Sequence, residues 1–305
     1  MPRLAGALAV VLLATGCGGG TSEEAPAGDK PGAGRPAVKL GTKNFDEQVL
    51  LGHLYAEALR AKGFKVTLKP SIGATEVIDR ALTSGQIDLY PEYTGVIVSV
   101  VKRQAATPST ARQTYVQARA FERSRGFELL AATPFEDRDA IAVTKRFSRD
   151  NGGLDSLTDL RRLGPSVFLS GAPEFRTRYA GLMGLRRAYK LTALRYVPLP
   201  IGQAYPALDS GKVQAAAVFT TDGPLATGRY DLLADPKAIF GFQNVAPVVS
   251  QKTLAAEGPE FAATLDAVSA KLTNEVMQGL NQAVTIEGSA PEAVAREFLR
   301  ANGLA

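Results

Sequence analysis

The residues that most often carry enzymatic chemistry are almost absent from this chain. His53 is the only histidine and Cys17 the only cysteine among the 305 residues. A catalytic Ser-His-Asp or Cys-His arrangement is therefore nearly excluded, and a zinc site of histidine and cysteine ligands is excluded. A lone histidine inside a predicted helix is typical of packing or of the surface. We expect a protein that is not an enzyme and holds neither metal nor cofactor.

Other patterns for binding cofactors, metals or nucleic acids are incomplete. Residues 181–184 (GLMG) lack the preceding strand and the later acidic residue of a dinucleotide site. Asp159, Asp209 and Asp222 do not have the spacing of a calcium-binding loop. Basic residues are scattered rather than clustered with aromatic ones, so the formal net charge of +5 does not predict a nucleic-acid partner.

Five ordered segments carry a family resemblance. They are residues 41–48 (GTKNFDEQ), 88–95 (DLYPEYTG), 173–185 (PEFRTRYAGLMGL), 220–223 (TTDG) and 244–249 (NVAPVV). Their order and spacing resemble the signatures of osmoprotectant-binding proteins of ABC importers, which take glycine betaine, choline or carnitine. The resemblance covers nearly all of the chain after its first forty residues, and the second segment is its most specific part.

The resemblance implies a fold and a role. The fold is the α/β, two-lobed periplasmic-binding-protein type II fold, in which each lobe has a central mixed sheet flanked by helices and the ligand lies in the cleft between the lobes. The role is capture of a small zwitterionic or cationic osmolyte, such as a betaine or choline, for the permease and ATPase subunits of an ABC importer. We expect the protein to be a monomer.

The resemblance also implies how the ligand is held. A quaternary ammonium has no hydrogen to donate, so aromatic faces hold it by cation–π attraction, while lysine and arginine grip a carboxylate. Lys43 and Arg178 match the family's carboxylate-binding positions. Tyr93 and Phe219 match two of its four aromatic positions. With their motif neighbours, the predicted ligand-binding residues are Lys43, Asn44, Tyr93, Thr94, Arg178, Phe219 and Thr220, together with the two replacements described next.

Two of the four aromatic positions are polar in this chain, where Asp139 and Gln243 stand. Phe219 keeps a ring without the hydroxyl, and Val96 occupies a position that is often polar in the family. Phe242, next to Gln243, could turn inward instead. The reduced aromatic cage puts the identity of the ligand in question.

Asp139 changes the expected chemistry, because a buried carboxylate without a partner is costly or shifts its pKa. One alternative is a zwitterion bearing an amine, amidine or guanidine, held by Asp139 and Gln243 at one end and by Lys43 and Arg178 at the other. The second is that Asp139 only pairs with Arg138 at the rim of the cleft. A scaffold or an enzyme on the same fold is a rival of another class, although a scaffold would not need these residues to converge.

The N-terminus predicts export and a lipid anchor. Arg3 precedes an apolar run at 4–14, which is shorter than the roughly 18–20 residues that span a bilayer and resembles the core of a signal peptide. Small residues then lead to Cys17, as in a lipobox, although Leu13 stands one position too early. We expect a signal peptide at 1–16 and an extracytoplasmic protein, lipid-anchored to the cell membrane through Cys17. An ordinary signal peptide with a chance cysteine is the alternative.

The remaining chain predicts a linker and two lobes. Residues 17–37 are rich in Gly, Pro, Ala and Glu, and such a segment buries too little apolar surface to offset its ordering entropy, so we expect a flexible linker. The body is long for a single core. The predicted lobes are 38–139 plus 246–305 for the first and 140–245 for the second, with the chain crossing between them near both junctions.

Alternating elements support this division. A helix at 45–62 capped by Asn44, a strand at 65–68, a helix at 75–83 and a strand at 87–90 predict right-handed crossovers in a mostly parallel sheet. A helix end, glycine and strand start at 81–87 (ALTSGQI) recur at 207–213 (ALDSGKV), which suggests lobes of related build. The segment 259–304 is predicted to be helical and to pack on the first lobe through Leu265, Val268, Leu272, Val276 and Leu280.

Overall fold

The computed structural model describes residues 30–104 and 108–305. The predicted signal peptide at 1–16, the lipid anchor at Cys17 and most of the linker predicted at 17–37 lie outside the described residues. Residues Pro31–Ala305 form one compact unit. In the described part of the chain, no helix has the length and apolar character that a membrane span requires.

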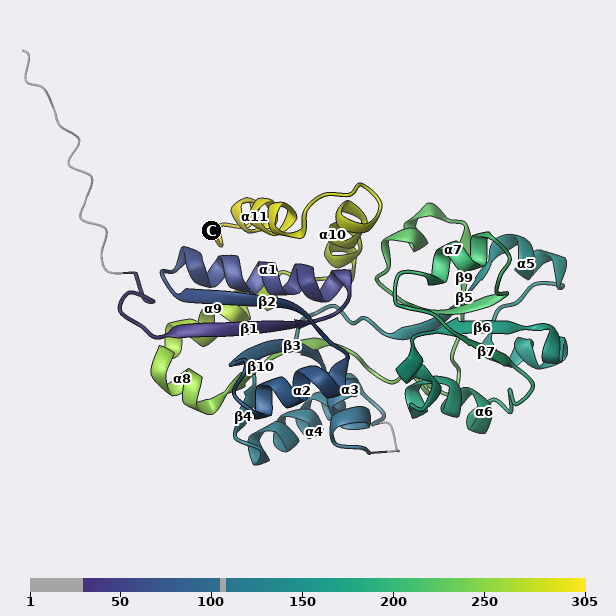
Figure 1. The fold of residues 1–305 in the computed structure, drawn as a ribbon, viewed down its shortest axis with the longest axis horizontal. Helices are drawn as coiled ribbons and strands as arrows, with labels where there is room; N and C mark the ends of the chain where they lie inside the picture. Colours follow the sequence, from purple (N-terminus) through teal and green to yellow (C-terminus); the bar gives the residue numbers. More distant parts are fainter. Residues whose placement is uncertain (1–29, 105–107) are drawn as a thin grey trace, which may run out of the picture. The chain divides into compact units, whose positions relative to one another are not determined.

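The first lobe is built on a five-stranded mixed sheet (Figure 1). β1 runs parallel to β2 and β3, while β10 is antiparallel to β3 and β4. The strands, in their order across the sheet, are β2 (Lys65–Gly73), β1 (Ala37–Lys43), β3 (Leu89–Tyr93), β10 (Val245–Ser250) and β4 (Phe127–Leu129).

The second lobe repeats this plan. β6 runs parallel to β7 and β8, while β5 is antiparallel to β8 and β9. The expectation of mostly parallel sheets is confirmed by strand direction. In each sheet only one strand, β10 in the first lobe and β5 in the second, runs against the others, and each of these enters its sheet from the other lobe. The strands, in their order across the sheet, are β7 (Arg195–Pro198), β6 (Phe168–Gly171), β8 (Ala215–Phe219), β5 (Asp139–Thr144) and β9 (Tyr230–Leu233).

Helices cover both sheets. Those that follow strands of the first lobe are α1 (Asp46–Ala61), α2 (Thr75–Thr83), α3 (Thr94–Val96) and α4 (Ala111–Ser124). The C-terminal ones are α8 (Gln251–Glu257), α9 (Pro259–Ser269), α10 (Asn274–Thr285) and α11 (Pro291–Ala301). The second lobe has α5 (Lys145–Asp150), α6 (Gly184–Ala188) and α7 (Ala204–Asp209). Short 3₁₀ or π turns occupy Ile97–Val101, Leu157–Ser166, Pro173–Arg176, Tyr179–Met183 and Gly223–Thr227.

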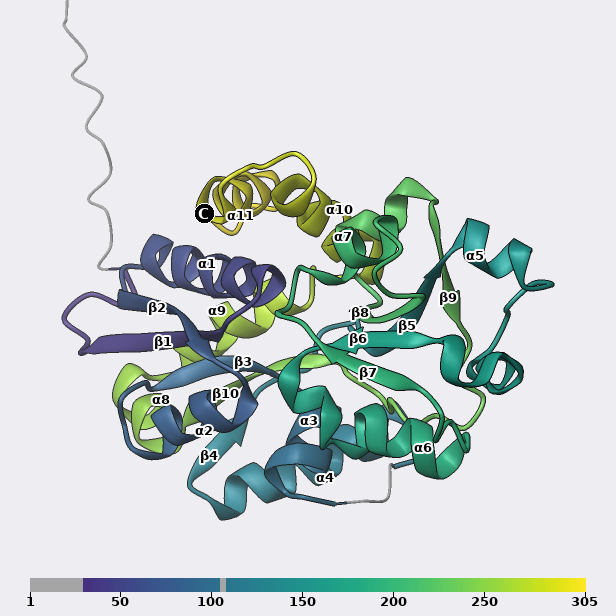
Figure 2. The ribbon, with the colours of Figure 1, turned by 45° about the vertical axis from the view of Figure 1, so that its right-hand side comes forward.

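The apolar stripe predicted at the C-terminus is confirmed. Leu265, Val268 and Leu272 are fully buried in the core that α1 and β1 share, and Val276 and Leu280 pack against that core. The helix α10 also reaches the second lobe (Figure 2), where its side chains bond to the carbonyl groups of residues 220 and 221. The C-terminal helices therefore belong to the first lobe and contact the second.

The repeated segment marks the same structural position in both lobes. The α2–β3 and α7–β8 connections each end a helix at a glycine, and Gly85 and Gly211 have φ of 72° and 71°. Their N–H groups donate to the carbonyls of Leu82 and Leu208 at 3.0 Å in both cases. Because β3 and β8 also hold equivalent places in their sheets, the prediction of lobes with related build is confirmed.

The chain crosses between the lobes twice, after β4 and after β9, and the two crossings lie side by side at residues 136–137 and 243–244. Glu136 pairs with Asn244 in an antiparallel bridge, and the N–H of Asp137 donates to the carbonyl of Gln243 at 3.2 Å. We propose that these two crossing segments form the hinge, with the first lobe at 38–139 plus 246–305 and the second at 140–245.

Candidate functional site

A cleft of about 440 Å³ is lined by residues of both lobes. The carboxyl ends of β1, β3, β6 and β8 converge on it, as do the first residues of α1 and the start of β5. Ligands of open α/β sheets bind outside the carboxyl ends of the strands. The topology therefore places the ends of the predicted motifs at one location.

Seven of the nine predicted ligand-binding residues line this cleft: Lys43, Asn44, Tyr93, Asp139, Arg178, Phe219 and Gln243. Thr94 and Thr220 are not among the lining residues. The Thr94 hydroxyl faces the carbonyl of Phe242 at 3.4 Å, and the Thr220 hydroxyl accepts the N–H of Arg138 at 3.0 Å. Both threonines stabilise the segments that cross between the lobes.

Three expectations about neighbouring residues are wrong. Phe242 does not replace the missing ring, because it is not among the residues that line the cleft. Arg138 does not pair with Asp139, because its guanidinium lies 3.3 Å from the carboxylate of Glu136. Asn44 lines the cleft but does not cap α1, whose first residue is Asp46 and whose N-cap position is Phe45.

Lys43 is buried at the end of β1 and already has an anionic partner. Its Nζ donates to Glu92 Oε1 at 2.5 Å and lies 4.8 Å from the centroid of the Tyr93 ring. Burial lowers the pKa of Lys43, and the charge of Glu92 opposes that shift. Sequence reasoning missed Glu92, although an acidic residue inside an otherwise apolar strand is a signal. Leu40 of β1 pairs with Leu89 of β3, and Lys43 and Glu92 follow these two residues at the same distance, so the strand register brings them together.

Arg178 has a partner across the cleft. Its Nη2 lies 3.0 and 3.2 Å from the two carboxylate oxygens of Glu76, in the first turn of α2. This ion pair joins the second lobe to the first and is partly open to solvent, because the two side chains are 21% and 49% exposed. Within the described part of the chain, Arg178 Nε is buried and has no hydrogen-bond partner.

Three aromatic rings form a row across the cleft. Phe45 stacks on Phe219 with centroids 5.2 Å apart and on Tyr93 with centroids 6.2 Å apart. Tyr93 is almost fully buried, and its hydroxyl donates to Glu47 at 2.8 Å. Phe45 was not predicted, although it follows Lys43 and Asn44 in the first motif. The row joins the first lobe to the second through the faces of neighbouring rings.

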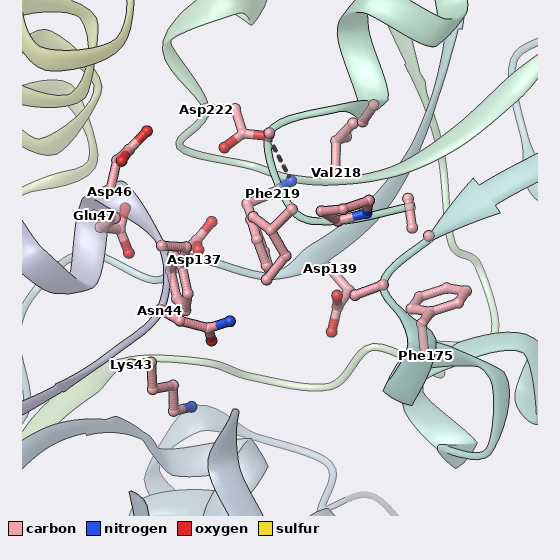
Figure 3. A pocket seen from close by; sticks show the side chains of 18 of the residues that line it. Lys43, Asn44, Asp46, Glu47, Asp137, Asp139, Phe175, Val218, Phe219 and Asp222 are labelled. Carbon is pink, nitrogen blue, oxygen red and sulfur yellow. Dashed lines mark hydrogen bonds between the residues drawn. The ribbon is translucent and has the colours of Figure 1, made fainter. Parts of the chain in front are cut away.

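Asp139 and Gln243 differ in their surroundings. Asp139 is the cross-strand partner of Phe219, and its side chain points into the cleft (Figure 3). Among the described residues, none donates a hydrogen bond to its carboxylate. Burial raises the pKa of Asp139 to about 6, against the opposing charges of Arg178 and Lys43. Gln243, by contrast, is buried and tied to the backbone: it accepts from the N–H of Val96 at 3.0 Å and donates to a carbonyl.

A buried acidic network lies beside the aromatic row, and sequence reasoning missed it. The Glu47 carboxylate accepts bonds from Thr221 Oγ1 at 2.5 Å and from Asn281 Nδ2 at 2.8 Å. The Asp137 carboxylate accepts the N–H of Thr221 at 3.1 Å, and burial raises the pKa of both acids. Burial also raises the pKa of Asp222 to about 7. This network joins α1, the hinge, the second lobe and α10.

Comparison with known proteins identifies the family. Residues 36–301 match the family described as the substrate binding domain of ABC-type glycine betaine transport systems. A glycine-betaine-binding protein of Pseudomonas aeruginosa is 32% identical over 278 residues, which are 88% of each chain. The glycine betaine-binding protein YehZ of Escherichia coli is 31% identical over 278 residues, which cover 87% of this chain and 90% of YehZ.

A solved structure confirms the fold. The crystal structure of a glycine betaine/carnitine/choline ABC transporter protein superposes with a TM-score of 0.71 at 23% identity, over 88% of this chain and 99% of that one. The predicted two-lobed periplasmic-binding-protein type II fold is therefore confirmed.

Proposed function

Because this chain belongs to the family of substrate-binding domains of ABC-type glycine betaine transport systems, we propose that it captures a small betaine- or choline-type osmolyte outside the cytoplasm for an ABC importer. The observation that carries the proposal is the row of Phe45, Phe219 and Tyr93 in a two-lobed cleft, beside the carboxylate of Asp139. The relatives named for glycine betaine support the same ligand class.

The geometry supports binding by elementary electrostatics. Aromatic faces attract a methylated ammonium, and a carboxylate close to the ring edge adds Coulomb attraction without a need for hydrogen bonds. Closure of two lobes removes water from the cleft, which strengthens both terms. The arrangement therefore supports reversible capture of a cationic group rather than a reaction.

A thermal-shift panel tests the proposal. The purified chain is heated with glycine betaine, choline, carnitine and, as a control, an uncharged polyol, and unfolding is followed with a dye because the sequence has no tryptophan. A ligand at about 100 times its Kd adds about 2.7 kcal/mol of stability, which is on the order of several degrees for a protein of this size. Phe219→Ala should abolish the shift. A panel in which no quaternary ammonium raises the Tm contradicts the function.

We further propose that Cys17 anchors the protein to the membrane by a lipid and that the folded body works as a monomer with separate permease and ATPase subunits. The small residues before Cys17 support the anchor, and the family supports the transport partners. Expression of the full chain and of its Cys17→Ala variant, followed by fractionation, tests the anchor. The wild type should remain with membranes and the variant should not; equal release of both contradicts lipidation.

A further inference from the structure

Acidic and basic side chains from both lobes line the cleft. We propose that the cleft prefers a small monocation that carries a hydrogen-bond donor and no carboxylate, as choline does, over a zwitterion such as glycine betaine, and that Asp139 sets this preference. The proposal rests on the proposed function and narrows it from an osmolyte class to one charge type.

Both cations expected to grip a ligand carboxylate are already neutralised by the protein. Lys43 is paired with Glu92, and the two side chains are 5% and 0% exposed. Arg178 is paired with Glu76 across the cleft. A ligand carboxylate that approaches either cation must share it with a protein carboxylate, and two anions at one cation repel each other. The carboxylate of a zwitterion therefore gains little here.

Three other carboxylates of the cleft, in contrast, have no cationic partner. Asp46, Asp139 and Glu174 line the cleft, and no lysine or arginine among the described residues lies within ion-pair distance of any of them. The buried acidic network of Glu47, Asp137 and Asp222 lies next to them. The cleft is thus locally anionic in a chain with a formal net charge of +5. A monocation is attracted to such a site, whereas a zwitterion brings its own anion into it.

Asp139 is the one of these three that reaches the aromatic row. It faces Phe219 across the β5–β8 pairing, where side chains directly opposite each other lie close together. Figure 3 shows its carboxylate in the cleft between Phe219 and Phe175. An ammonium against the Phe219 ring therefore places the rest of a short solute within reach of Asp139. A hydroxyl there can donate to the carboxylate, whereas a ligand carboxylate cannot.

Titration calorimetry with three solutes tests the proposal on the purified full chain. The solutes are choline, glycine betaine and propyltrimethylammonium, which share the trimethylammonium group and differ in the terminal hydroxyl, carboxylate or methyl. We expect choline to bind about ten- to hundredfold more tightly than propyltrimethylammonium, because a hydrogen bond to a charged group is worth about that factor. The advantage over glycine betaine should be at least as large, because its carboxylate is repelled by Asp139.

A matched variant outside the cleft controls for the loss of one negative charge. Asp139→Asn should reduce the choline-to-betaine ratio to within about threefold of one, whereas Asp150→Asn, which removes an exposed carboxylate that does not line the cleft, should leave the ratio unchanged. Glu76→Gln should tighten glycine betaine binding by freeing Arg178. Far-ultraviolet circular dichroism establishes that each variant is folded.

Each outcome decides a different claim. Glycine betaine binding to the wild type as tightly as choline overturns the charge preference and leaves the proposed function standing. A choline preference that survives Asp139→Asn overturns the role of Asp139. Absence of binding by all three solutes overturns the proposed function and, with it, this inference.

Discussion

The two ion pairs of the cleft differ in burial and in the lobes that they join. Lys43 and Glu92 lie on neighbouring strands of the first lobe and are both buried. Arg178 and Glu76 lie on different lobes, and water reaches both. The first pair is part of the folded core of one lobe, so it exists whatever the lobes do. The second joins the two lobes, so it would break if the lobes moved apart.

Removal of one member of the buried pair should have the largest effect. Glu92→Gln leaves the Lys43 ammonium buried without its anion, which typically costs about 3–5 kcal/mol. We expect the Tm to fall by about 10 °C, measured by calorimetry without ligand. The double variant Lys43→Met/Glu92→Leu removes both charges and should recover most of the loss. If Glu92→Gln costs no more than a change in the exposed pair, burial is not what distinguishes the two pairs.

The buried acidic network is a third contact between the lobes, and it predicts a dependence of stability on pH. Glu47, Asp137 and Asp222 all have pKa values raised by burial, that of Asp222 to about 7. The folded state therefore binds more protons than the unfolded state between about pH 4 and pH 7. Stability should rise as the pH falls from 8 to 5, by up to about 1.4 kcal/mol per pH unit for each extra proton.

Urea unfolding at pH 8, 7, 6 and 5 measures this dependence. Asp222→Asn should flatten the slope, although its bonds from Tyr205 and from the N–H of Phe219 must be rearranged. Because Asp139 also has a raised pKa, Asp139→Asn is the matched comparison, and it should flatten the slope from about pH 6 downward. Stability that increases from pH 5 to pH 8 would contradict the burial of these acids.

The sequence predicted the architecture better than the charge balance of the site. The ordered motifs and the repeat around Gly85 and Gly211 were enough to predict two lobes of related build. Each glycine ends a helix with a positive φ, and the strand that follows holds the same place in its sheet. The predicted cations do line the cleft. Their partners were missed, because Glu76 meets Arg178 only after the chain has crossed between lobes, and no spacing of residues along the sequence encodes that distance.

Glu92 and Glu47 were missed for a different reason. Glu92 could have been found from strand register, since it stands as far beyond Leu89 as Lys43 stands beyond Leu40 in neighbouring parallel strands. The helix dipole favours acidic residues in the first turn of any helix, which is a sufficient reason for an exposed Asp46. Glu47 instead turns inward to the network, and only the packing of α10 beside it shows why.

The affinity for a cationic ligand should also depend on pH, through the charge of Asp139 in the cleft. The pKa of Asp139 near 6 means that most of its negative charge is lost between pH 7.5 and pH 5. Affinity for a monocation should therefore fall by about tenfold over this range, since roughly a tenth of the carboxyl is ionised one unit below its pKa. Calorimetry with choline measures the change, and Asp139→Asn should remove most of it. A pH-independent affinity would place the cation away from Asp139.

The smallest effect should come from the exposed pair. Glu76→Gln removes an ion pair that solvent screens, and such pairs contribute about 0–1 kcal/mol. We expect a change in Tm of no more than about 3 °C at low ionic strength, and a smaller one in 0.5 M salt because screening shortens the reach of the charges. The matched variant Glu292→Gln removes a similarly exposed partner of Arg296 within the first lobe.

A loss of stability from Glu76→Gln as large as that from Glu92→Gln would mean that the Arg178 pair is also part of the core, and that the lobes form one rigid body. A small loss from Glu76→Gln, of the same size as that from Glu292→Gln, leaves the pair free to open at little cost. An ion pair that spans a cleft must open easily if solute is to enter and leave. A weak Arg178–Glu76 pair therefore suits capture, whereas the Lys43–Glu92 pair stays closed because neither buried charge can lose its partner without a large cost.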